Sequence, residues 1–257
     1  MKNYKNYIEI IVDDWQKNGF CCSAVKLNTA IGSEYFDTCN PHFYAGDLNA
    51  KLVMVQLNPK RELKDFNEKS TITQPQYFDF YSNYGKTHYG IERKENWKSK
   101  FDQKLIRFLR PLNLLEINST DIFKNLENVV DQKLQLELIP FGSTSFDYTK
   151  IPQHLFSEYI ELILSLITST ERNCVIFGGR VFSKILSSYI TSKEVFRFKL
   201  QKVNGDLTKN EYEIEKLTLC YKGKFFNAFI TPQFAQQGMP VEAYGKKLAE
   251  IIKNLNN

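Results

Sequence analysis

Apolar residues recur along the chain with two different spacings, which distinguish helices from strands. Helical spacing, with apolar side chains three or four positions apart, predicts five helices: 4–15, 101–109, 156–167, 181–189 and 241–255. Gly19 can end the first of them. Short apolar runs predict four buried strands: 51–57, 134–141, 174–177 and 226–231. Buried strands separated by helices are typical of a parallel sheet with helices on both faces.

The predicted fold is therefore α/β, with three layers (α/β/α) and a central, mainly parallel four-stranded sheet. Two segments interrupt the pattern. Residues 60–96 are aromatic and rich in turn residues, and a loop that long is usually functional or contains unrecognised structure. Residues 194–224 alternate apolar and charged stretches around Asn204-Gly205, a hairpin-turn sequence. Without repeats or low-complexity linkers, the 257 residues are expected to form one domain.

Composition is that of an ordinary globular protein, with 42% hydrophobic and 25% charged residues. No stretch approaches the roughly 20 apolar residues that span a bilayer. The N-terminus leads into an amphipathic segment rather than the apolar block of a signal peptide, so we expect a cytoplasmic protein. The net charge of +5 suits a polyanionic partner without requiring one.

The cysteines and histidines have no metal-binding spacing. No Cys-x-x-Cys pair occurs, and the histidines do not complete a zinc pattern. We expect reduced, mostly buried thiols, no metal cluster and no other cofactor. The residues concerned are Cys21, Cys22, Cys39, Cys174, Cys220, His42, His88 and His154.

Polar and turn-forming residues follow the predicted strands. Gln-Leu-Asn-Pro occupies 56–59, Pro-Phe-Gly-Ser-Thr-Ser occupies 140–145, Phe-Gly-Gly-Arg occupies 177–180, and Thr-Pro-Gln occupies 231–233. In open α/β sheets, ligands bind outside the carboxyl ends of the strands. The sequence therefore predicts that these four segments meet at one ligand-binding edge.

The order and spacing of these strand ends resemble the uracil-DNA glycosylase superfamily, across roughly residues 40–255. Its first motif is a strand ending in Gly-x-Asp/Asn-Pro. Its last is a strand ending in His-Pro-Ser or Asn-Pro-Ser, followed by a loop that enters the DNA minor groove. The resemblance implies a single uracil-DNA glycosylase-like domain over 1–257, with insertions at about 60–96 and 194–224, which acts on DNA as a monomer and does not bind membranes.

The activity implied by the resemblance is that of a monofunctional DNA glycosylase, which flips a base and hydrolyses its N-glycosidic bond to leave an abasic site. Asn58 matches the residue that orients the attacking water, and Pro59 would fix its backbone. Because an asparagine cannot take up a proton as a carboxylate can, a second carboxylate is expected to assist. Glu137 and Asp147 are the candidates, and Glu137 is preferred. The competing interpretation of Asn58 is a turn residue that hydrogen-bonds its own backbone.

Three positions depart from the family pattern. Gln56 replaces the usual glycine, Thr231 replaces the histidine that stabilises the leaving uracil, and Lys60 stands where the uracil-specific branch has a tyrosine. Ordinary uracil is therefore not the expected substrate. The preferred substrate is a bulky modified pyrimidine, such as a modified cytosine in phage DNA, since some members of the superfamily act in defence against phages with modified genomes.

Candidate contact residues surround the two motifs. The predicted base pocket comprises Gln56, Leu57, Pro59, Tyr77, Phe78, Phe141 and Thr231, with Tyr77 or Phe78 stacking on the base, although a core strand explains that aromatic run equally well. Predicted DNA contacts are Lys60, Arg61, Ser143, Ser145, Arg180 and Gln233, with Phe234 and Met239 as apolar wedges. Phe234 and Met239 could equally anchor the last helix, and the basic residues could form a solvated face.

Other functions remain open from the sequence. A nucleotide- or phosphosugar-binding enzyme would use the turn at 177–180, although neither Gly-x-Gly-x-x-Gly nor a P-loop motif occurs. A repair glycosylase for uracil or mismatches would keep the same chemistry on another base. A binding module could keep the superfamily fold without activity. A serine hydrolase is disfavoured because there is no Gly-x-Ser-x-Gly motif.

Overall fold

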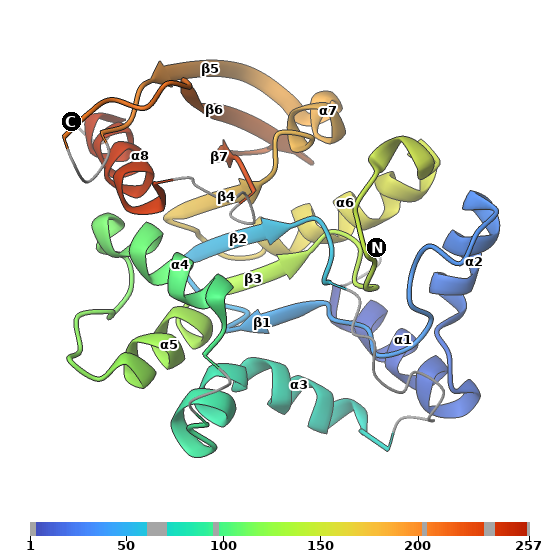
Figure 1. Cartoon of the computed structure of the whole chain (residues 1–257). Coiled ribbons are helices and arrows are strands. Elements are labelled where there is room, and N and C mark those ends of the chain that lie inside the picture. Colours follow the sequence, from blue (N-terminus) through green and yellow to red (C-terminus); the bar gives the residue numbers. More distant parts are fainter. Residues whose placement is uncertain (1–3, 61–70, 95–97, 202–204, 234–239, 256–257) are drawn as a thin grey trace.

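A seven-stranded sheet runs through the centre of the molecule (Figure 1). The computed structural model describes residues 4–60, 71–94, 98–201, 205–233 and 240–255. The strands follow the order β1-β3-β2-β4-β7-β6-β5. Their bounds are β1 Tyr44–Gly46, β2 Leu52–Gln56, β3 Leu134–Glu137, β4 Cys174–Gly178, β5 Ile190–Phe198, β6 Tyr212–Tyr221 and β7 Lys224–Thr231.

Four strands, β3, β2, β4 and β7, are parallel neighbours in the middle of this sheet. β1 adds an antiparallel edge beside β3, and β6 and β5 extend the other side as antiparallel strands. The prediction of an α/β fold is confirmed, but the sheet is larger than the predicted four strands. About half of residues 194–224, the second predicted insertion, form parts of β5 and β6 within the sheet.

A two-residue hairpin turn joins β6 to β7. Its residues, Lys222 and Gly223, both have positive φ, 49° and 77°, which gives the turn a backbone twist that matches the twist of the two strands. Tyr221 then pairs with Lys224, and the register continues to Glu215 opposite Ile230. Asn204-Gly205, where the sequence predicted a hairpin turn, lies in the connection between the antiparallel neighbours β5 and β6, flanked by a bridge between Gln201 and Leu207; Asn204 itself is outside the described residues.

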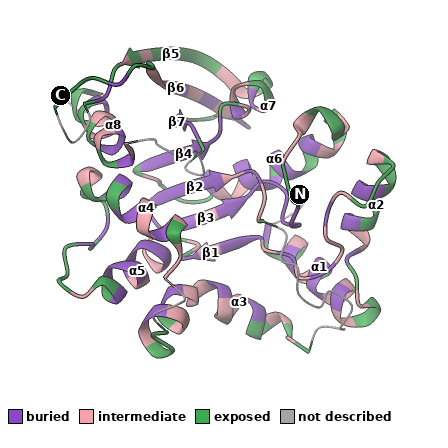
Figure 2. Ribbon diagram, in the orientation of Figure 1, coloured by how far each residue is buried: buried purple, intermediate pink, exposed green. Residues whose placement is uncertain are grey.

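Helices cover both faces of the sheet (Figure 1). β2 is apolar on both of its faces and therefore needs helices on both sides. Val53 and Val55 pack in the cluster that includes α1 and α6, while Leu52 and Met54 pack in the cluster of α4, α5 and α8. Figure 2 shows the central strands as the buried layer between the helices. The helices are α1 Tyr4–Asn18, α2 Cys22–Ile31, α3 Gln74–Ser82, α4 Lys100–Leu109, α5 Ile122–Asp131, α6 Gln153–Ile167, α7 Phe182–Ile185 and α8 Val241–Leu255, with a π-helix, η1, at Lys86–Ile91 and 3₁₀ turns η3 Arg110–Leu112, η4 Tyr148–Lys150 and η5 Ser187–Tyr189.

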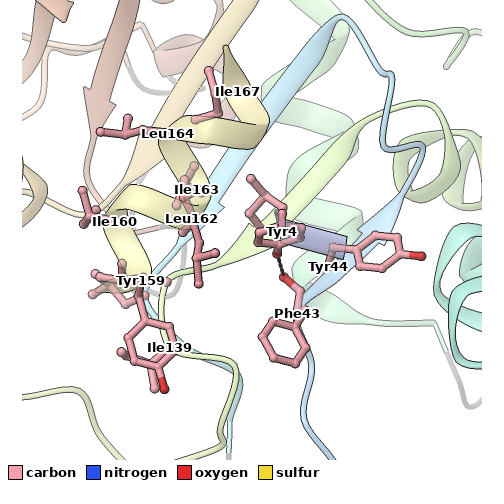
Figure 3. Packing of buried hydrophobic residues seen from close by; sticks show 14 of the residues in the cluster. Tyr4, Phe43, Tyr44, Ile139, Tyr159, Ile160, Leu162, Ile163, Leu164 and Ile167 are labelled. Atoms are coloured by element: carbon pink, nitrogen blue, oxygen red, sulfur yellow. Dashed lines mark hydrogen bonds between the residues drawn. The ribbon is translucent and has the colours of Figure 1, made fainter. Parts of the chain in front are cut away.

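The first predicted helix, α1, is anchored to the β1 edge of the sheet by a buried polar contact. The Tyr4 hydroxyl donates to the Phe43 carbonyl oxygen at 2.9 Å (Figure 3). Ile8, Ile11 and Val12 follow on the same buried face, as the apolar spacing predicts. Gly19 ends the helix with φ 79° and donates its backbone N–H to Trp15.

The aromatic run at 77–81 forms helix α3, neither a strand nor a structureless loop. Thr73 begins this helix with a capping box, because its hydroxyl accepts from the Gln76 backbone while the Gln76 side chain accepts from Thr73. Tyr77 and Tyr81 lie one helical turn apart and are both buried. Helices α2 and α5 were also missed by the sequence pattern, and the helix predicted at 181–189 is only the short α7 followed by a 3₁₀ turn.

The close contact between α8 and α4 predicts that replacing a helical glycine by alanine destabilises this protein. Alanine normally stabilises a helix relative to glycine by about 1 kcal/mol. A Cβ at Gly245, however, would lie 2.1 Å from the Phe108 carbonyl oxygen, so the helices would have to separate. We expect Gly245→Ala to lower the free energy of unfolding by about 1–3 kcal/mol in urea titrations.

The matched control is Lys246→Ala, the next residue, whose side chain is exposed and pairs with Glu242 in the same helix. Its free energy of unfolding should stay within about 0.5 kcal/mol of the unsubstituted protein. A Gly245→Ala protein as stable as this control, or more stable, would contradict the close packing of α8 on α4.

Candidate functional site

The segment after β2 is held in place by backbone pairing beyond the end of the strand. The Gln56 carbonyl accepts from Leu138 N–H at 2.8 Å, and the Pro59 carbonyl accepts from Ser143 N–H at 3.2 Å. Residues 56–59 therefore run beside the continuation of β3 and have little freedom to move. This pairing fixes the backbone on both sides of Asn58.

The Asn58 side chain has one defined orientation. Its amide nitrogen Nδ2 donates to Ser143 Oγ at 2.7 Å, to the Phe141 carbonyl at 3.2 Å and to the Pro59 carbonyl at 3.0 Å. Within the described part of the chain, its carbonyl oxygen Oδ1 has no hydrogen-bond partner. Asn58 is thus more than a local turn residue: it joins two strand ends and keeps an acceptor available for a bound molecule.

A cavity of about 490 Å³ opens beside Asn58, in the region of β1 and β3. Its volume lies within the range of roughly 300–1,000 Å³ typical of small-molecule sites. Polar and aromatic side chains dominate its lining, which comprises His42, Tyr44, Ala45, Gln56, Leu57, Asn58, Pro59, Lys60, Tyr81, Tyr84, Ser99, Phe101, Asp102, Val130, Lys133, Gln135, Glu137 and Gln233. Among the predicted site residues, it brings together Gln56, Leu57, Asn58, Pro59, Lys60, Glu137 and Gln233.

Three side chains on one face of β3 form a hydrogen-bonded chain along the cavity. Lys133 Nζ donates to Gln135 Oε1 at 3.1 Å, and Gln135 Nε2 donates to Glu137 Oε1 at 2.9 Å. Burial raises the pKa of Glu137 to about 7 and lowers the pKa of Lys133. Glu137 can therefore change protonation near neutral pH, which suits a group that exchanges protons with a substrate.

Asp102 supplies a second buried carboxyl to the cavity, and the sequence did not suggest it. The Tyr89 hydroxyl donates to Asp102 Oδ2 at 2.6 Å, and burial raises the pKa of Asp102. Ser99 caps α4 and bonds the Asp102 backbone, a local signal that marks only a helix start. Only the packing of α4 over the sheet brings this carboxyl near β3.

The aromatic residues of α3 line the cavity differently from the prediction. Tyr77 is buried, and its hydroxyl donates to the Pro41 carbonyl at 2.7 Å, away from the lining. Phe78 packs against Tyr44 instead. Tyr81 and Tyr84 line the cavity, and helical spacing from Tyr77 is the sequence signal that would have identified them.

A second hollow of about 560 Å³ adjoins the cavity and shares residues 57–60 and Gln233 with it. Predicted DNA contacts Lys60, Ser143, Ser145, Arg180 and Gln233 all line this hollow, which we call the serine groove; Thr144, Phe146, Asp147, Tyr148, Thr149, Gly179, Val181 and Pro232 complete its lining with Leu57, Asn58 and Pro59. The segments that follow β2, β3, β4 and β7 therefore meet at one edge.

Charges in the serine groove are partly compensated. Arg180 Nε lies 3.5 Å from Glu213 Oε1, so this guanidinium already has an acidic neighbour. Asp147 accepts from the Thr149 backbone and hydroxyl, which lowers the pKa of Asp147. Of the two carboxyls considered from the sequence, only Glu137 lines the cavity.

Several predicted residues lie elsewhere. Phe141 and Thr231 are fully buried and line neither the cavity nor the serine groove, although the Phe141 carbonyl accepts from Asn58. Arg61, Phe234 and Met239 lie outside the described residues.

No protein-family model matches the chain, and no curated protein matches it. Among the described residues, no three His, Cys, Asp or Glu side chains gather closely enough to hold a metal ion. None of the described helices is long and apolar enough to cross a membrane. The function must therefore be inferred from the geometry of the cavity and the serine groove.

The raised pKa of Glu137 predicts a pH dependence of stability. The unfolded chain releases this proton near pH 4.5 and the folded protein near pH 7, so the folded state loses stability as pH rises between these values. Glu137→Gln removes this loss. Its free energy of unfolding, relative to the unsubstituted protein, should rise by about 3 kcal/mol between pH 4.5 and 8 in urea titrations.

Glu171→Gln is the control, since the Glu171 side chain is 87% exposed. Its stability relative to the unsubstituted protein should be nearly constant over this pH range. If the free energy of unfolding of Glu137→Gln, relative to the unsubstituted protein, were equally constant with pH, burial would not raise the pKa of Glu137.

Proposed function

We propose that this chain is a monofunctional DNA glycosylase, which flips a base out of DNA and hydrolyses its N-glycosidic bond to leave an abasic site. The observation that carries the proposal is the placement of Asn58. This amide is held by Ser143 and Phe141 between the cavity and the serine groove, which is lined by hydroxyl and basic side chains. A flipped base needs such a cavity, and the flanking phosphates need such a groove.

The reaction requires one water molecule and no cofactor. The C–N glycosidic bond breaks as the sugar gains oxocarbenium character, the water oxygen bonds to the anomeric carbon, and a proton ends on the released base. Asn58 Oδ1 can accept a hydrogen bond from that water and so direct its lone pair toward the sugar. The three acceptors around Nδ2 keep Oδ1 from rotating away.

Glu137 is the carboxyl that we assign to assist Asn58. It lines the same cavity, and its pKa of about 7 allows it to exist in either protonation state at neutral pH. Asp147 is less suited, because it lines the serine groove and not the cavity, and its Oδ1 already accepts two hydrogen bonds from Thr149.

The size and polarity of the cavity favour a bulky modified pyrimidine, such as a modified cytosine in phage DNA. A volume of about 490 Å³ is generous for an unsubstituted pyrimidine ring, and Asp102, Lys133 and Gln135 give the excess space polar walls. A substituent on the base could hydrogen-bond there. A role in defence against phages with modified DNA follows from this substrate.

The parallel order β3-β2-β4-β7 supports the resemblance to the uracil-DNA glycosylase superfamily, because it sets the Asn58 and Thr231 motifs at carboxyl ends on one edge. Thr231 cannot replace the superfamily histidine, since its hydroxyl is fully buried outside the cavity. This difference argues against ordinary uracil as the substrate, and it also favours the second candidate, a binding protein without activity.

Base release tests the proposal directly. The protein is incubated with uracil-containing, mismatched and phage-modified DNA, and released bases are identified by mass spectrometry. We expect release from phage-modified DNA, with alkali-labile sites left behind. Asn58→Ala should lower the rate by about 100-fold or more while DNA binding persists.

Asn173→Ala is the matched control, because Asn173 is exposed at the start of β4, on the opposite edge of the sheet. It should release base at the unsubstituted rate. DNA binding with no release from any substrate would favour the binding protein, and equal rates for Asn58→Ala and Asn173→Ala would remove Asn58 from the mechanism.

The serine groove gives a separate prediction for DNA affinity. Lys60 is exposed at its border with the cavity. If Lys60 contacts a phosphate, Lys60→Ala should weaken binding of all DNA sequences similarly and reduce the slope of log affinity against log salt by about 1. The control is Lys253→Ala, on the far end of α8; a slope unchanged in both variants would exclude Lys60 from the DNA contact.

A further inference from the structure

The last residues of the four parallel strands form a row across one face of the sheet. Gln56 is paired in register with Glu137, and Gly178 with Thr231. The Gln56 side chain lies over Gly178, where an added Cβ would be 2.6 Å from Gln56 Oε1. Gln56 follows Met54 by two positions, so the row faces the same side of the sheet as α4, α5 and α8. We call these four residues the terminal row.

Two polar atoms of the terminal row are buried at the cavity and have no hydrogen-bond partner among the residues that the structure describes. They are Gln56 Nε2, a donor, and Glu137 Oε2, an acceptor when ionised. A buried polar atom without a partner destabilises a protein by about 1–3 kcal/mol. Although the two residues are neighbours, they do not bond to each other, which is the arrangement expected where a ligand supplies both partners.

The other oxygen of Glu137 is already used, because Oε1 accepts from Gln135 Nε2 at 2.9 Å. Gln135 is in turn held by Lys133 at 3.1 Å. The carboxyl therefore has a fixed orientation, and only Oε2 is available to a ligand. Glu137 is 9% exposed, so water cannot easily replace that ligand.

We propose that Gln56 and Glu137 together recognise the base-pairing edge of a pyrimidine that carries an exocyclic amine, as cytosine does. Glu137 Oε2 accepts from the amine, and Gln56 Nε2 donates to a ring nitrogen or carbonyl on the same edge. Uracil-type bases present a carbonyl in place of the amine, and two acceptors would then face each other. This inference rests on the proposed function. It narrows the substrate class to pyrimidines that carry an exocyclic amine on the base-pairing edge, with any substituent elsewhere on the ring.

The test compares two bases that differ only on this edge. Duplexes contain a single 5-hydroxymethylcytosine or a single 5-hydroxymethyluracil, and kcat/KM for base release is measured at pH 8, above the pKa of Glu137. We expect the cytosine-type base to be released at least about tenfold more efficiently. A preference for the uracil-type base, or none, would overturn the proposal.

Glu137→Gln should invert the preference when binding of 2′-deoxy-5-hydroxymethylcytidine and 2′-deoxy-5-hydroxymethyluridine is compared by titration calorimetry, a readout that does not need the carboxyl assigned to the reaction. Gln135 would still donate to the retained oxygen, so the new amide nitrogen would take the position of Oε2 and present a donor there. The variant should favour the carbonyl-bearing base, and circular dichroism confirms that it is folded. An unchanged preference in the folded variant would show that Glu137 does not touch this edge of the base.

A binding measurement distinguishes failure of the proposed function from failure of the recognition pair. If neither duplex releases a base, binding of 2′-deoxy-5-hydroxymethylcytidine and 2′-deoxy-5-hydroxymethyluridine is measured by titration calorimetry. Tighter binding of the cytidine by at least about tenfold would support the recognition pair without catalysis. Equal binding of the two nucleosides, or no binding of either, would overturn it.

Discussion

The pairing of residues 56–59 with the continuation of β3 is the constraint on which the site depends. Regular strand pairing stops at Gln56 opposite Glu137, yet the backbone contacts of Leu57 and Pro59 continue as far as Ser143. A loop that simply left the sheet would allow the Asn58 side chain many orientations. Here the second strand end supplies the acceptors for its amide, so the orientation of this polar group is fixed.

The alternation of side chains along residues 133–137 explains why charged and polar groups are buried beside the cavity. Leu134 and Leu136 on one face of β3 pack into the core. Gln135 and Glu137 on its other face, with Lys133 just before the strand, line the cavity. Burial disfavours the charged forms of Lys133 and Glu137, as the direction of their pKa shifts shows. The apolar face of the strand holds these groups in place, and the hydrogen bonds through Gln135 limit the unfavourable free energy of burying them.

Part of the cavity lining comes from Tyr81, Tyr84 and residues 99–102, which lie far from β3 in sequence. α3 brings Tyr81 to the cavity, and Tyr84 follows just after the helix. The π-helix η1 is attached to α5 because the Asp131 carboxylate accepts from the backbone of Gly85 and Lys86. π-helical turns are rare and often lie near functional sites. Here the turn lets Tyr89 bond Asp102, so the lining of the cavity depends on local structure that has no strong sequence signal.

The sequence by itself determined the parts that local spacing controls. Apolar periodicity identified α1, α4, α6, α8 and the four parallel strands, because burying one face of a helix or both faces of a strand leaves a regular pattern. Pro59 after an apolar run likewise placed Asn58 at a strand end. The tertiary structure alone decided that β5 and β6 join the sheet, and which side chains share the cavity. Asp102, Lys133 and Tyr84 meet there, and Gln56 stands beside Glu137, because strand register and helix packing bring together residues that are distant along the chain, and no local pattern encodes that proximity.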